Sequence, residues 1–300
     1  MLKLYVLHHS ASYIPYCGSL IFIEIFTLYQ AQNCVHATHC SKMTISSVPN
    51  RVSRTFSSLQ ALRIDAHNVL NELSHSNYNG NQYILVQELP EDICTLLDTD
   101  RNALDGISFR FSFRDRTGLI KLIPTYNHHT CIANFIHQLT FAMITAGYPF
   151  NDIQWAGNTT FQPTSSEGKQ PDNCFLPPSR QGYGGQPGWP TMVLEAAVSE
   201  SLPQLREEVK WWFENSEGAV RIVLLLGVEQ AERTVFLEKW EQSEVYQSPY
   251  MAQQVKITPS TADEASLCLS FAALFDRAPG LAERDVVLDT QGLVRIAANL

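Results

Sequence analysis

Apolar residues recur along the chain with two kinds of spacing, and each kind predicts a type of secondary structure. Spacings of three and four residues predict helices at 55–74, 90–97, 128–146 and 201–215. Continuous or alternating apolar runs predict strands at 83–89, 107–113, 119–123, 153–155 with 159–161, 173–176, 191–195, 220–228 and 234–240. The residues Arg114–Gly118 supply a turn, so 107–123 is expected to form a hairpin.

The order of these elements predicts an α/β fold. After about residue 127 come a helix, three strands, a second helix and two strands, which favour a mixed sheet with helices on its faces. We therefore expect a core at 127–242, an N-terminal helix and hairpin region at 43–126, and a C-terminal addition at 243–300 that packs on the core. The last region has weaker strand signals at 255–257, 267–269 and 285–288, and its end is expected to form a terminal helix.

Residues 1–42 differ in character from the rest of the chain. Their apolar run at 17–29 contains Glu24 and is too short to span a bilayer, although it leaves a signal-like segment as an alternative. A cluster of cysteine and histidine at 34–40 is too tightly spaced for the usual zinc arrangements. We expect residues 1–42 to be either a poorly structured extension or the result of a misassigned start. In the second case the protein would begin at Met43.

The composition of the chain limits the classes of binding partner and the cellular compartment that we expect. The chain has 30 acidic and 21 basic residues, giving a formal charge of -9, so it lacks the basic surface of a dedicated high-affinity nucleic-acid binder. A polyanionic substrate would need a local basic patch or bound metal ions. Seven cysteines without a C-x-x-C pair are typical of an intracellular protein, nuclear or cytoplasmic, and we expect no membrane association.

Two acidic residues occupy places that suit metal binding. Asp172 follows Pro171 at the start of a predicted strand, and Glu195 ends the predicted strand 191–195. Carboxylates at the ends of neighbouring strands present the hard oxygen ligands that Mg²⁺ prefers. The alternative is that Asp172 caps a turn and Glu195 marks where the strand reaches solvent.

The spacing of these acids resembles the signature of the PD-(D/E)XK nuclease superfamily, and most closely its Uma2-like branch. The resemblance rests on Pro171–Asp172, Glu195, His137 in the preceding helix, and the segments 170–175 and 190–199. It covers roughly a third of the chain. A third interpretation is an unrelated fold in which the two carboxylates are incidental.

The resemblance implies a restriction-endonuclease-like core, with N- and C-terminal additions, that cleaves phosphodiester bonds in nucleic acid, DNA rather than RNA. It implies Mg²⁺ or Mn²⁺ held by Asp172, Glu195 and the main-chain carbonyl of Ala196. The alternative function is a catalytically inactive module of the same fold that binds nucleic acid or protein.

The motif's usual lysine is absent, because Ala197 stands two residues after Glu195. In the Uma2-like branch this lysine comes from the next helix, and Lys210 is at the comparable place, so Lys210 is the expected catalytic cation. Arg206 lies one helical turn earlier on the same side and is an accessory candidate. The other accessory candidates are His137, as a ligand or phosphate contact, and Lys169, as a phosphate contact. Each of these four residues also has a plain alternative, as a solvated or packed side chain.

Overall fold

The computed structural model describes residues 51–298, except 79, 124–125, 158, 183–186, 199–200, 244 and 262–265, and except the side chains of 126–128 and 198. The expectations for residues 1–42 therefore lie outside the described residues. None of the helices in the described part of the chain is long and apolar enough to cross a membrane.

The first sheet, called the N-terminal sheet, has the strand order β1-β2-β4-β3-β7-β6. Its β1 and β2 are parallel, and every other neighbouring pair is antiparallel. Apolar residues of helices α1 and α2 pack on one of its faces, against Ile84, Phe111 and Ile120. The strands and helices are β1 (Val52–Thr55), α1 (Leu59–His75), β2 (Tyr83–Gln87), α2 (Glu91–Thr99), β3 (Phe109–Arg114), β4 (Thr117–Leu122), β6 (Phe161–Thr164) and β7 (Glu167–Lys169).

The second sheet, called the central sheet, has the order β12-β11-β10-β9-β8-β5. Its β9 and β10 are parallel and its other pairs are antiparallel, so the sheet is mixed. The elements of this part are α3 (Tyr126–Thr145), β5 (Gln154–Trp155), β8 (Asn173–Leu176), β9 (Met192–Val198), α4 (Leu202–Asn215), β10 (Ile222–Glu229), β11 (Thr234–Gln242) and β12 (Pro249–Ile257), with short 3-10 turns at Phe150–Asp152 and Pro178–Arg180.

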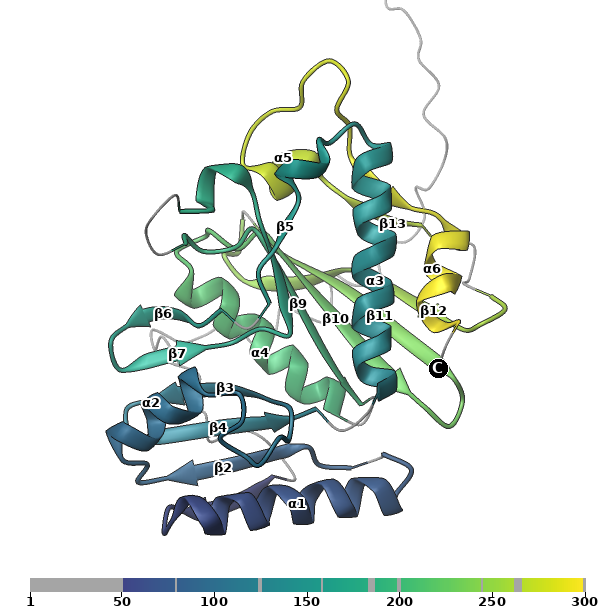
Figure 1. The fold of residues 1–300 in the computed structure, drawn as a ribbon. Coiled ribbons are helices and arrows are strands. Elements are labelled where there is room, and N and C mark those ends of the chain that lie inside the picture. The colour runs from purple at the N-terminus through teal and green to yellow at the C-terminus, as the bar shows by residue number, and fades with distance from the viewer. Residues whose placement is uncertain are drawn as a thin grey trace, which may run out of the picture. The chain divides into compact units, whose positions relative to one another are not determined.

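Helices α3 and α4 cover opposite faces of the central sheet (Figure 1). Successive residues of a strand point to opposite faces, so Leu194 and Leu224 meet α3 while Val193 and Val223 meet α4. The predicted α/β fold with a mixed central sheet flanked by helices is confirmed. Its likeness to restriction endonucleases stays a prediction.

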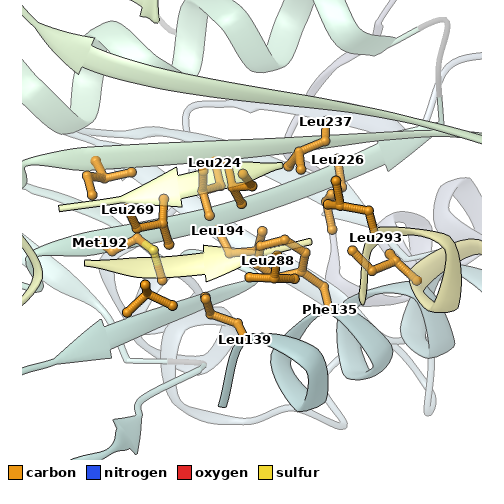
Figure 2. Packing of buried hydrophobic residues seen from close by; sticks show 14 of the residues in the cluster. Phe135, Leu139, Met192, Leu194, Leu224, Leu226, Leu237, Leu269, Leu288 and Leu293 are labelled. Atoms are coloured by element: carbon orange, nitrogen blue, oxygen red, sulfur yellow. The ribbon is translucent and has the colours of Figure 1, made fainter. Parts of the chain in front are cut away.

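The C-terminal elements complete the core on the α3 side. They are β13 (Leu267–Leu269), α5 (Phe271–Phe275), β14 (Val286–Leu288) and α6 (Thr290–Ala297). Figure 2 shows Leu269, Leu288 and Leu293 packed with Phe135 and Leu224 in one buried cluster. This region therefore shares its hydrophobic core with the central sheet.

Three elements are absent from the sequence-based prediction, namely β1, β7 and α5. The strand β7 has only three residues and no apolar periodicity. Its place is fixed by pairing with β3, where Gly168 lies opposite Phe113. A Cβ atom on Gly168 would come within 2.7 Å of the Phe113 ring, so a side chain does not fit there.

Substitution of Leu224 tests whether the hydrophobic core of the central sheet is packed as described. It is fully buried in β10, so Leu224→Ala should lower the free energy of unfolding by about 2–5 kcal/mol through lost contacts and a cavity. The matched control is Leu281→Ala, which removes a fully exposed leucine and should change stability by less than about 0.5 kcal/mol. Urea denaturation of both variants makes the comparison, and equal losses would contradict the described core.

Candidate functional site

The antiparallel pairing of β8 and β9 brings Asp172 and Glu195 together. Asn173 pairs with Leu194, so Asp172, just before β8, comes opposite the middle of β9. The main-chain N–H of Ala196 donates a hydrogen bond of 2.8 Å to Asp172 Oδ2. Glu195 does not end its strand, because β9 continues to Val198, and Glu195 is buried. The alternative that Glu195 marks where the strand reaches solvent is therefore wrong.

The segment before Asp172 is fixed by the buried side chain of Gln170. Its amide nitrogen donates to Asp98 Oδ1 at 2.9 Å and to Thr160 Oγ1 at 3.0 Å. Its amide oxygen accepts a hydrogen bond of 2.7 Å from Arg101. Gln170 thus ties the approach to Asp172 to helix α2 and the start of β6.

The ammonium group of Lys121 lies between the two carboxylates. Its Nζ atom is 2.7 Å from Asp172 Oδ2 and 3.1 Å from Glu195 Oε2. Burial favours a lower pKa for Lys121, but the two carboxylates outweigh it and raise the pKa above its ordinary value. Burial also raises the pKa of Glu195, against the opposing effect of Lys121 and Lys169. The lysine therefore stays charged at neutral pH.

A second lysine and a third carboxylate extend this arrangement. Lys169 Nζ is 2.6 Å from Glu208 Oε2 and 3.8 Å from Glu195 Oε1. Glu208, from α4, also accepts a hydrogen bond of 3.2 Å from the Tyr83 hydroxyl. Burial and the charge of Glu208 raise the pKa of Tyr83 well above its ordinary value, so Tyr83 remains a hydrogen-bond donor. Trp212 Nε1, also from α4, donates to Glu195 Oε1 at 3.0 Å.

The N-terminal sheet supplies the positively charged side chains of the site. Arg110, Lys121 and Tyr83 are aligned across β3, β4 and β2, so they share one face of that sheet. Arg110 Nε is 3.4 Å from Asp172 Oδ1 and donates to the carbonyl of Pro171. The six charged residues that meet here, called the charge cluster, are Arg110, Lys121, Lys169, Asp172, Glu195 and Glu208.

Lys210 and Arg206 do not reach the charge cluster, so the expectation that they lean over the strand ends is wrong. Lys210 Nζ is 3.0 Å from Glu207 on the exposed side of α4. Arg206 pairs with Glu238 of β11. On a helix that turns about 100° per residue, Glu208 faces the cluster and Lys210, two positions later, faces away.

Of the two accessory candidates that remain, the structure brings Lys169 into the cluster but not His137. The His137 side chain is exposed and forms no hydrogen bond or ion pair with a described residue. His129 is two turns earlier on α3, and its pKa responds to the cluster: burial and Arg110 lower it, while Asp172 acts in the opposite direction. The His129 side chain is partly covered by the protein, remains accessible to solvent and borders the site.

Sequence reasoning missed Lys121, Arg110, Tyr83 and Glu208. One signal for Lys121 was present, because it interrupts the apolar run 119–123. A lysine in a strand buried on both faces needs a carboxylate partner. The partner cannot be read from the local sequence, since Asp172 is 51 positions away from Lys121.

The donor atoms of this site fit a hard divalent cation. Asp172 and Glu195 offer carboxylate oxygens, which Mg²⁺ prefers. The Ala196 carbonyl projects from the same strand edge as its N–H, which contacts Asp172. The ammonium of Lys121 stands in for a cation between the two acids. No group of three or more histidine, cysteine or acidic side chains among the described residues has a metal-binding arrangement.

Comparison with known proteins adds no family assignment, since no protein-family model matches the chain and no curated protein matches it in sequence. The resemblance to PD-(D/E)XK nucleases therefore rests on the quoted residues.

Two lysine–glutamate pairs of different burial provide a test of the cluster. Lys169→Met leaves Glu208 buried without its ammonium partner and should lower the free energy of unfolding by about 3–5 kcal/mol. Lys210→Met breaks an exposed pair of similar length and should cost less than about 1 kcal/mol. Chemical denaturation measures both. Similar losses for the two variants would show that burial does not strengthen the Lys169 interaction.

Proposed function

We propose that the chain is a metal-dependent phosphodiesterase that acts on nucleic acid, DNA rather than RNA. The observation that carries the proposal is the convergence of two carboxylates and a lysine. Asp172 and Glu195 both contact the Lys121 ammonium within 3.1 Å, although the three residues come from separate segments. Two carboxylates can hold a divalent metal, and a lysine can stabilise the negative charge that develops on a phosphate.

Asp172, Glu195 and the Ala196 carbonyl are the groups that would hold Mg²⁺ or Mn²⁺. The metal, when bound, supplies positive charge to the phosphate and lowers the pKa of an attacking water. The protein's own residues orient the carboxylates: the Ala196 N–H fixes Asp172, and Trp212 fixes Glu195. Lys169, which is 3.8 Å from Glu195, and the ammonium of Lys121, once it has left the acids, would supply positive charge to the phosphate.

Burial limits how fast such a site can work. The side chains of Asp172, Glu195 and Lys121 are only 0%, 1% and 5% exposed. A phosphodiester reaches them only after the surrounding side chains move. The net charge of -9 also opposes the approach of DNA. We therefore expect weak cleavage.

A second candidate function is the catalytically inactive module that binds nucleic acid or protein. The observation in its favour is the charge balance of the cluster, where three cations meet three carboxylates. A complete set of ion pairs can hold the two sheets together without any ligand. In this alternative the acids are structural and binding occurs elsewhere on the surface.

A nuclease assay tests the first function. Purified protein with Mg²⁺ or Mn²⁺ should cut single- or double-stranded DNA slowly, and EDTA should abolish the activity. Asp172→Asn and Glu195→Gln should each reduce the rate by about 100-fold or more, because each removes a charge that holds the metal.

The matched control is Glu238→Gln, which neutralises a buried carboxylate of β11 that pairs with Arg206. This variant should keep the wild-type rate. RNA is the comparison substrate. Absence of cleavage of every substrate with both metals, or equal rates for wild type and Glu195→Gln, would refute the catalytic function. DNA binding that persists in such an inactive protein, measured by fluorescence anisotropy, would support the second candidate.

A further inference from the structure

We propose that Lys121 is an internal cation that competes with the divalent metal for the Asp172–Glu195 pair, so that the pair holds either the lysine or the metal. The inference rests on the proposed function, since it concerns the same carboxylates. It goes further by assigning Lys121 a regulatory effect on metal affinity.

The hydrogen bonds of the two carboxylates carry this inference. Asp172 Oδ2 accepts from both Lys121 Nζ, at 2.7 Å, and the Ala196 N–H, at 2.8 Å. Glu195 accepts from Lys121 through Oε2 and from Trp212 through Oε1. Asp172 Oδ2 thus already accepts two hydrogen bonds, and the ammonium occupies the space between the two carboxylates. A metal that bridges the same oxygens has to displace Lys121.

The charge of the cluster leads to the same conclusion. With Lys121 in place, three cations balance three carboxylates, and a divalent ion would leave two excess positive charges in a buried site. If the ammonium leaves first, the excess falls to one. Because an uncompensated buried charge is strongly unfavourable, exchange is favoured over simultaneous occupation.

Only the side chain of Lys121 can make this exchange. Its strand β4 is paired on both sides, with β2 and β3, so the backbone is held in register. A lysine side chain has four rotatable bonds and reaches other positions without backbone movement. The competition therefore depends on a side-chain rotation and weakens metal binding in the wild type.

Titration with Mn²⁺, followed by the electron paramagnetic resonance signal of the free ion, tests the competition. Lys121→Ala should bind one Mn²⁺ at least about tenfold more tightly than the wild type, a change of about 1.4 kcal/mol. Lys121→Arg keeps the positive charge and should bind as weakly as the wild type. Lys210→Ala, which removes an exposed lysine, should also leave the affinity unchanged. The double variant Lys121→Ala with Asp172→Asn should lose the gain.

Stability measurements keep the test decisive if Lys121→Ala folds poorly. The variant lacks a cation between two buried acids, and Mn²⁺ should replace it and raise the thermal unfolding temperature. The wild type should show a smaller increase at the same concentration. A variant that binds Mn²⁺ no more tightly than the wild type, or that stays unfolded with and without Mn²⁺, would overturn the inference.

The outcomes separate this inference from the proposed function. Tight Mn²⁺ binding by Lys121→Ala without cleavage of any nucleic acid by the wild type would support the competition and refute the phosphodiesterase. Cleavage by the wild type, with no gain in Mn²⁺ affinity for Lys121→Ala, would support the phosphodiesterase and refute the competition.

Discussion

The contact on which the arrangement of this protein depends is the buried ammonium of Lys121 between Asp172 and Glu195. Lys121 belongs to the N-terminal sheet, and the two acids belong to the central sheet and the segment that enters it. Because a charge that is buried without a partner is strongly unfavourable, this contact fixes how the two sheets face each other. Arg110 and Lys169 form further ion pairs with these two acids, and the Ala196 N–H and Trp212 donate hydrogen bonds to them.

In each sheet the residues of the charge cluster project from one face, and the other face packs its apolar side chains against helices. In the N-terminal sheet, Phe109 and Phe111 face the helices, while Arg110 and Lys121 face the acids. In the central sheet, Leu194 packs toward α3, and its neighbour Glu195 points to the other face. A period of two along each strand therefore places the cluster residues of a sheet on one face, which in the central sheet they share with apolar residues that pack on α4.

The sequence predicted the fold better than it predicted the partners within the site. Long periodic segments such as 201–215 and 220–228 appear as helix α4 and strand β10, because burial of an apolar face dictates both. Asp172 and Glu195 were identified from their strand positions. Lys210 was selected by resemblance, but its side chain projects from the exposed side of α4. The direction of a helical side chain depends on its position around the helix axis, which the resemblance did not fix. Lys121 was missed because its contact with Asp172 depends on how two sheets pack, which no local pattern encodes.

The alignment of Arg110, Lys121 and Tyr83 across three strands also restricts how such a sequence can diverge. Insertion of one residue within β4 before Lys121 would turn the lysine toward the helices and bring an apolar neighbour to the acids. Loops can change in length without this effect, as can the ends of the strands. In proteins that descend from this sequence, the position of Lys121 within strand β4 should thus vary less than the identities of the other residues in the hairpin.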